Sequence, residues 1–182
     1  MTRVRDLFLL FVLFAVCGWI YEVLLTLWAY GYFENRGFLF GPWLPIYGFG
    51  GIALYFCLGK ILGKPVVRRG TAALRLLLVF LGICALTTVF ELAASYLLDA
   101  VGVGYRTLWF YDGEPFNFDG RVSFIASARF GVLGTAALYL GVPLWERVIS
   151  VKNQKPLNIA AIVLGVLFFI DLAVKLLSMA GA

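Results

Sequence analysis

Ionisable side chains interrupt several long apolar stretches of this sequence, and they are the residues there most able to do chemistry. They are Glu22, Glu91, Arg129, Asp171 and Lys175. A charged side chain at the centre of a membrane costs about 2.5–3.5 kcal/mol or more, so such residues face a protein interior and mark binding sites, proton relays or structural ion pairs. A carboxylate can bind a cation or carry a proton, whereas an arginine holds an anion through paired hydrogen bonds. These five positions are therefore the first candidates for a functional site.

The stretches around these residues are long and apolar enough to cross a membrane. Of the 182 residues, 63% are hydrophobic and only 14% are charged, whereas soluble domains are about 45–50% apolar and about 25% charged. A chain this short would also have too little interior to hide that much apolar surface from water. We predict an all-α polytopic membrane helical bundle that forms a single integral membrane domain over residues 1–182. About five spans of roughly 20 residues fit the pattern: 7–30, 43–62, 76–100, 122–145 and 157–180.

The distribution of basic residues predicts the orientation of these spans. Ten basic residues lie on the side of the N-terminus: Arg3, Arg5, Lys60, Lys64, Arg68, Arg69, Arg75, Arg147, Lys152 and Lys155. The opposite loops carry three, Arg36, Arg106 and Arg121. Because short loops rich in lysine and arginine stay in the cytoplasm, we predict a multi-pass protein of the cell membrane. Its N-terminus would be cytoplasmic and its C-terminus outside.

The composition argues against metal, nucleotide and nucleic-acid chemistry. The sequence has no histidine, and Cys17, Cys57 and Cys84 all fall within predicted spans without a CxxC motif, so a zinc site is not expected. The spacing of a phosphate-binding loop is also missing. The net charge of +5 comes from residues scattered over short loops, which is unlike a nucleic-acid-binding surface. We therefore expect no cofactor, no metal and no nucleic-acid partner.

Four of the five ionisable residues fall at a similar depth in their predicted spans. From a rise of about 1.5 Å per residue, Glu22 lies roughly 12 Å below the outer end of its span and Glu91 roughly 14 Å. By the same measure, Arg129 and Asp171 lie roughly 10 and 14 Å below theirs. We expect Arg129 to pair with Glu22 or Glu91. Asp171 and Lys175 are four residues apart, so we expect them to pair on one helix face.

Two loop segments between the spans combine polar residues with many glycines and aromatics. They are "YFENRGFLFGPWLPIYGFGG" at 32–51, the first loop segment, and "GYRTLWFYDGEPFNFDGRVSF" at 104–124, the second loop segment. Irregular backbone at membrane depth is tolerated only where protein buries it or where it lines a cavity. We predict that these segments re-enter or cap the bundle and close a polar pocket. The candidate substrate-binding residues are Glu22, Asn35, Arg36, Tyr47, Glu91, Asn117, Arg121 and Arg129.

The two halves of the chain also resemble each other. "IYEVLLTLWAY" precedes the first loop segment and "VFELAASYLLD" precedes the second. Arg36 follows Glu22 by 14 residues, and Arg106 follows Glu91 by 15. A parallel repeat of two helical hairpins would explain the pattern, and chance similarity of two short stretches remains the alternative.

The two loop segments carry a family resemblance. "YFENRGFLFGPWLPIYGFGG" and "PFNFDGRVSF…FGVLG" resemble the paired signatures of the family called "Putative ABC-transporter type IV" (CmpB-like), which are bacterial multi-pass membrane proteins. The resemblance covers roughly residues 8–148. It departs from the family pattern at Asp112, which is displaced from the usual position of the acid, and at Phe130, where relatives often have tryptophan. The resemblance implies a shared site at Glu22, Asn35, Arg36, Gly37, Gly41, Pro42, Pro45, Tyr47, Gly48, Glu91, Asn117, Gly120 and Arg121.

Three functions fit these observations. The first is a permease-like binding or translocation protein, whose outward-facing pocket takes a small charged molecule or a lipid headgroup. Arg36 and Arg121 would hold an anionic group, while Glu22 and Glu91 would bind a cationic group or carry a proton. Five helices are few for a lone transporter, so we expect a homodimer or a partner subunit. The alternatives are an intramembrane enzyme acting on a lipid-linked substrate and a non-catalytic structural membrane subunit.

Overall fold

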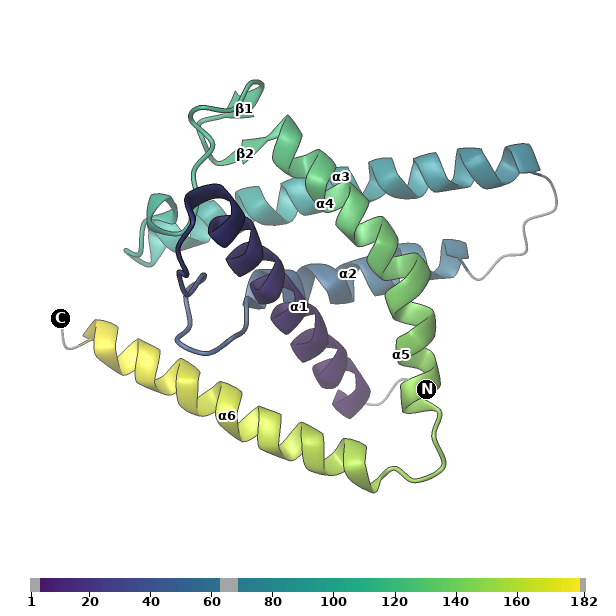
Figure 1. Ribbon diagram of the computed structural model, residues 1–182. Coiled ribbons are helices and arrows are strands. Elements are labelled where there is room, and N and C mark those ends of the chain that lie inside the picture. The colour runs from purple at the N-terminus through teal and green to yellow at the C-terminus, as the bar shows by residue number, and fades with distance from the viewer. Residues whose placement is uncertain (1–3, 63–68, 181–182) are drawn as a thin grey trace. The chain divides into compact units, whose positions relative to one another are not determined.

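The described part of the chain forms helices joined by irregular segments, one of which contains a small hairpin. The computed structural model describes residues 4–62 and 69–180. Figure 1 labels the α-helices and the strands. In chain order the elements are α1 (Val4–Tyr30), α2 (Pro45–Leu62), α3 (Arg69–Ala100), η1 (Tyr105–Thr107), β1 (Asn117–Phe118), β2 (Val122–Ser123), α4 (Phe124–Ala136), η2 (Ala137–Gly141), α5 (Val142–Ile149) and α6 (Lys155–Ala180).

The helices confirm the predicted all-helical membrane bundle. Within the described residues, four helices have the length and hydropathy needed to cross a membrane: Val4–Tyr30, Thr71–Ala100, Phe124–Ile149 and Lys155–Ala180. The third of these runs through α4 and α5, and the turn of π-helix η2 joins the two. The remaining predicted span is α2, an 18-residue helix. At about 1.5 Å per residue it is roughly 27 Å long, close to the thickness of about 30 Å of a bilayer core.

The chain divides into two compact units. The first unit comprises Met1–Phe49 and Arg147–Ala182, and the second comprises Gly50–Glu146. The first unit therefore holds α1, the first loop segment and α6. The second holds α3, the second loop segment and α4. Each unit contains one of the two glutamates predicted to form the site.

Two glycines let α1 and α2 approach each other closely within the first unit. A Cβ atom added to Gly18 would lie 2.2 Å from Cγ of Tyr47. A Cβ atom added to Gly48 would lie 2.5 Å from Cδ2 of Phe11 and 2.9 Å from its backbone oxygen. Small residues are enriched where membrane helices pack because they let the backbones come together. This contact fixes where α2 presents Tyr47.

The second unit is built on the packing of α3 against α4. Figure 1 shows α4 lying across α3. Gly131 and Gly134 of α4 face α3, and added Cβ atoms there would lie 2.4 Å from Sγ of Cys84 and 2.6 Å from Cγ2 of Ile83. Ile83 is fully buried. The contact holds α4 and the hairpin that precedes it against α3.

A short hairpin in the second loop segment was not among the predicted elements. Strands β1 and β2 pair antiparallel, with Phe118 opposite Val122. The turn between them has positive φ at Asp119 (52°) and Gly120 (65°), and the backbone N–H of Arg121 donates to the oxygen of Phe118 at 2.9 Å. Two successive positive φ angles define a type I′ turn, for which Asp-Gly is a favoured pair. The turn sets the direction in which Arg121 leaves the hairpin.

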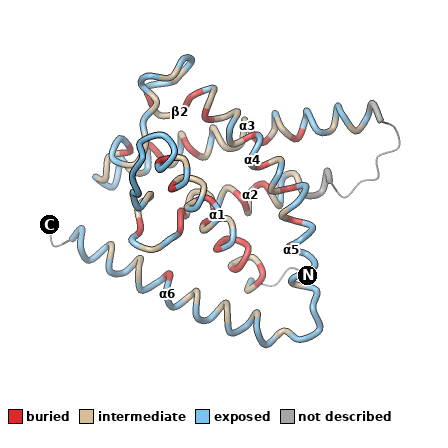
Figure 2. The backbone as a smooth tube through the Cα atoms, in the orientation of Figure 1, coloured by how far each residue is buried: buried red, intermediate tan, exposed pale blue. Residues whose placement is uncertain are grey.

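Burial is uneven among the helices. Figure 2 shows buried residues along α1 and exposed residues along most of α6. Phe168 is the buried residue of α6. The exposed residues of α6 are largely apolar, as expected for a helix that faces lipid. α6 is thus attached to its unit through both aromatic contacts at Phe168 and hydrogen bonds at Asp171.

Candidate functional site

The first unit brings together three predicted site residues, Glu22, Arg36 and Tyr47, which form the first cluster. The Tyr47 hydroxyl donates a hydrogen bond to Oε1 of Glu22 at 2.5 Å. Nε of Arg36 lies 4.0 Å from Oε2 of the same carboxylate, and Arg36 also donates to Glu34 at 3.4 Å. The side chains of Glu22 and Arg36 are 21% and 23% exposed. A half-buried carboxylate on α1 thus faces groups from both ends of the first loop segment.

Asn35 organises the first loop segment. Its Oδ1 accepts a hydrogen bond from the Trp19 indole at 2.7 Å, and its Nδ2 donates to the backbone oxygen of Phe40 at 2.8 Å. The amide therefore joins α1 to two points of the segment. The structure gives Asn35 a role in holding the backbone beside Arg36, and Trp19 is a partner outside the predicted site set.

Asp171 does not form the predicted ion pair with Lys175. Among the described residues, no salt bridge joins the two side chains. Asp171 instead accepts hydrogen bonds from the first loop segment. Its donors are the backbone N–H groups of Phe40 (3.1 Å) and Gly41 (2.8 Å) and the indole of Trp43 (2.6 Å). The spacing of four residues permits an ion pair, but donors supplied by the folded segment occupy the carboxylate.

The second unit contains a similar pair, Glu91 and Tyr111, which form the second cluster. The Tyr111 hydroxyl donates to Oε1 of Glu91 at 2.6 Å. Glu91 lies on α3 and is 5% exposed. The backbone N–H of Tyr111 donates to the oxygen of Gly120 at 2.8 Å, which ties this tyrosine to the hairpin turn. The hairpin thereby positions the phenol over the carboxylate.

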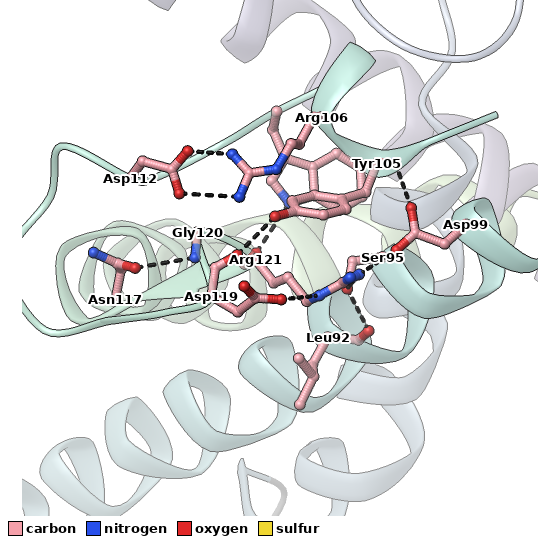
Figure 3. Close-up of polar contacts among 11 residues, drawn as sticks. Leu92, Ser95, Asp99, Tyr105, Arg106, Asp112, Asn117, Asp119, Gly120 and Arg121 are labelled. Atoms are coloured by element: carbon pink, nitrogen blue, oxygen red, sulfur yellow. Dashed lines mark hydrogen bonds and ion pairs between the residues drawn. The ribbon is translucent and has the colours of Figure 1, made fainter.

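Arg121 is surrounded by acceptors and aromatic rings (Figure 3). Its Nη1 lies 2.6 Å from Oδ2 of Asp99 and 3.3 Å from the hydroxyl of Ser95, and its Nε lies 3.0 Å from Oδ2 of Asp119. The guanidinium carbon lies 4.2 Å from the centroid of the buried Tyr105 ring. These contacts join the hairpin to the end of α3, so Arg121 serves first as a structural bridge.

Arg129 pairs with a carboxylate that was not among the candidates. Its Nη1 lies 3.3 Å from Oε1 of Glu114. Ser123 donates to the other oxygen of Glu114, and Asn117 donates to its backbone oxygen at 2.8 Å. Oδ1 of Asn117 also accepts from the backbone N–H of Gly120 at 3.0 Å. Arg129 and Asn117 therefore stabilise the second loop segment. We predicted that Arg129 would pair with Glu22 or Glu91, but it pairs with Glu114, and Glu91 accepts a hydrogen bond from Tyr111.

The two clusters share a pattern, although not the arginine spacing noted in the sequence. In each unit a tyrosine 20–25 residues after the glutamate donates to its carboxylate. The two Glu-to-Tyr spacings differ, at 25 and 20 residues, so the sequence carried no repeated signal for Tyr111. Arg106, by contrast, forms an exposed ion pair with Asp112, and this hydrogen bond raises the pKa of the Arg106 guanidinium above its ordinary value. Arg106 is thus not the counterpart of Arg36.

Carboxylates outnumber arginines around both clusters. Arg36 contacts Glu22 and Glu34. Arg121 contacts Asp99 and Asp119 while Glu91 lies one turn from its Ser95 contact. An anion would have to displace a carboxylate from either arginine, whereas a cation would relieve the excess of negative charge. The described residues contain no group of three or more acidic, cysteine or histidine side chains arranged to hold a metal ion.

The long apolar helices and the polar clusters between them define a multi-pass helical membrane protein. Residues 9–176 match the family model described as "Putative ABC-transporter type IV", and the chain belongs to that family. The match extends beyond the resemblance seen over 8–148 and includes most of α6 with Asp171. Comparison with curated proteins and with solved structures finds no match.

The environments of Arg121 and Arg106 predict different effects of their removal. Arg121→Ala would leave Asp99 and Asp119 without their cation, and its side chain is 12% exposed. The Arg106 side chain is 52% exposed, and exposed ion pairs contribute little to stability. We expect Arg121→Ala to lower the thermal unfolding midpoint in mild detergent clearly more than Arg106→Ala. Equal midpoints for the two variants would show that Arg121 does not bridge the hairpin to α3.

Proposed function

We propose that this protein is the membrane-spanning binding or translocation component of a transport system, and that its ligand carries a positive charge. The observation that supports this most is the tyrosine-capped glutamate in each unit, at Glu22 and Glu91, on helices long and apolar enough to cross a membrane. A carboxylate on such a helix marks a ligand or ion pathway by default. The family match supports the general class of an ABC-transporter-related membrane protein.

The charge around the clusters decides which ligand we favour. Both Arg36 and Arg121 already contact carboxylates, so they are poor sites for a free anion. The ring of Tyr21 lies beside that of Tyr47 in the first cluster, and aromatic faces attract cations. A small organic ammonium compound or the ammonium group of a lipid headgroup would satisfy both features. A coupling proton on Glu22 or Glu91 would use the same carboxylates.

The proposal includes an orientation in the cell membrane. The excess of basic residues in the loops on the same side as the N-terminus favours a cytoplasmic N-terminus and an external C-terminus. The two loop segments would then lie on the external side, re-enter the bundle and receive the ligand there. The chain has no phosphate-binding loop, so ATP hydrolysis, where it drives transport, would come from a partner subunit. A second copy of this chain would complete the pathway.

Native mass spectrometry tests the proposal directly. The wild type is released from membranes in mild detergent beside Glu22→Gln and Glu91→Gln, which keep the shape of each side chain and remove its charge. We expect the wild type to retain a discrete cationic species. In each variant, the fraction of protein that carries this species should be at least tenfold lower than in the wild type. Such a loss corresponds to about 1.4 kcal/mol of binding free energy or more.

Glu146→Gln is the matched control, because Glu146 is exposed and outside both clusters. It should retain the bound species as the wild type does. Retention by all four proteins, or by none, at equal thermal stability would count against a binding site at the two glutamates. The polar clusters would then be elements of architecture, and a structural subunit would become the better description.

A further inference from the structure

The carboxylate of Asp171 binds the first loop segment through three donors that converge from one side. Two are the backbone N–H groups of Phe40 and Gly41, and the third is the Trp43 indole. Hydrogen bonds to an ionised acceptor are stronger than those between neutral groups. A single side chain of α6 therefore holds an irregular stretch of backbone that has no helix or sheet of its own.

Neighbouring turns of α6 contact the same stretch, residues 38–43, which we call the latch segment. One turn after Asp171, the ammonium group of Lys175 lies 5.3 Å from the ring centroid of Phe38 and 4.8 Å from that of Phe40. One turn before it, the ring of Phe168 meets that of Trp43 edge to face at 5.8 Å. Three successive turns of α6 thus bind the latch segment.

The latch segment lies between the two groups that face Glu22. On its N-terminal side, Asn35 ties the backbone of Phe40 to the stretch that carries Arg36. On its C-terminal side, the N–H of Leu44 donates to Ala15 of α1 at 3.0 Å, three residues before Tyr47. Holding residues 38–43 therefore fixes both sides of the first cluster.

Two glycines with positive φ angles precede the latch segment. Gly31 and Gly37 have φ angles of 77° and 103°, values that glycine adopts readily and other residues rarely do. Gly31 has no atom within 4 Å of where a Cβ would lie. α6 buries little of its own surface, with Phe168 as its buried residue. Release of the Asp171 contacts would therefore expose Leu39 and Trp43 of the segment, which are 2% and 6% exposed, but little of α6.

We propose that Asp171 is a positioning residue that latches residues 38–43 closed beside the Glu22–Arg36–Tyr47 cluster, and that release of this latch opens the route to the cluster. The identity of what enters rests on the proposed function, whereas the latch itself does not. Two residues of α6 assist it: Lys175 contacts the rings of Phe38 and Phe40, and Phe168 contacts the ring of Trp43. Asp171 and Lys175, which the sequence predicted to pair with each other, instead both bind the latch segment.

Cysteine accessibility measures the state of the latch without a ligand. Leu39 is 2% exposed, so Leu39→Cys, in a protein whose three native cysteines are replaced by alanine, should react slowly with a bulky water-soluble maleimide. Adding Asp171→Asn weakens the three hydrogen bonds by removing the charge. We expect the rate of modification to rise at least tenfold in mild detergent at a temperature where the variant is still folded.

Further variants keep the test decisive. Trp43→Phe removes one donor and keeps an aromatic ring, so it should raise the rate of modification by less. If Asp171→Asn unfolds, Trp43→Phe becomes the variant that decides the test. Asp171→Glu should restore slow modification in part, and Glu146→Gln should leave the rate unchanged. An unchanged rate in the folded Asp171→Asn or Trp43→Phe protein would overturn the latch. Ligand retention is measured separately by mass spectrometry, so loss of the proposed function and loss of the latch are distinguishable.

Discussion

Gly18→Ala is expected to break the hydrogen bond between Tyr47 and Glu22. The added methyl group would lie 2.2 Å from Cγ and 2.6 Å from Cβ of Tyr47. These atoms are close to the backbone of α2, so the side chain cannot turn away and the whole ring must shift. Overpacking of this kind costs about 1–3 kcal/mol, and a lost hydrogen bond between membrane segments adds about 0.6–2 kcal/mol.

Part of this cost is offset, because alanine favours a helix over glycine by about 1 kcal/mol. We therefore expect a net loss of about 1–3 kcal/mol in the free energy of unfolding, measured by titration with a denaturing detergent. Gly50→Ala is the matched control, because a Cβ atom at Gly50 meets nothing within 4 Å; it should be neutral or stabilising.

Tyr47→Phe separates the two contributions to the Gly18→Ala effect. It removes only the hydroxyl that donates to Glu22, so it should destabilise the protein less than Gly18→Ala and reduce ligand retention to a similar degree. Equal stability of the Gly18→Ala and Gly50→Ala proteins would contradict the close α1–α2 contact that places Tyr47.

Gly131→Ala is expected to separate α4 from α3. Its methyl group would lie 2.4 Å from Sγ of Cys84 and 2.6 Å from Cε2 of Phe80. Both side chains belong to α3, which packs against α4 more extensively than any other pair of elements in the second unit. We expect a loss of about 1–3 kcal/mol in the free energy of unfolding, and weaker support for the hairpin beside Glu91.

Gly141→Ala provides the comparison for Gly131→Ala. Nothing lies within 4 Å of a Cβ atom at Gly141, so the same chemical change is made there without a clash. The difference between the two unfolding free energies isolates the packing term from the change in backbone entropy. A double substitution Gly131→Ala with Cys84→Ala should recover part of the loss, and no recovery would place the strain elsewhere.

Hydrophobic length was enough to predict the helices. The predicted spans 7–30 and 157–180 correspond to α1 and α6 within three residues at each end. A membrane helix satisfies its backbone hydrogen bonds within itself, so its position depends on its own residues and on the thickness of the bilayer. The same pattern could not show that the segment before α4 folds into a hairpin, whose signal is only the Asp119–Gly120 pair.

The candidate residues were easier to recognise in the sequence than their hydrogen-bond partners. The sequence singled out Glu22, Arg36 and Tyr47, and the structure brings these three together. It also singled out Glu91, but not the Tyr111 hydroxyl that faces it. Residue type and depth identify a costly buried charge, whereas the donor that relieves the cost is selected by how the loop folds back.

The charged residues show most clearly what sequence alone determines and what tertiary structure decides. The sequence determined that Asp171 and Arg129 lie within apolar helices and need partners, because that follows from composition and helix length. The tertiary structure decided that Asp171 binds the backbone of residues 40–41 and that Arg129 binds Glu114. Helical spacing limits only which side chains of one helix can meet. The donors of an irregular segment reach a distant carboxylate only because the turns, positive φ angles and packing of that segment place them there. These features depend on residues far apart in the chain.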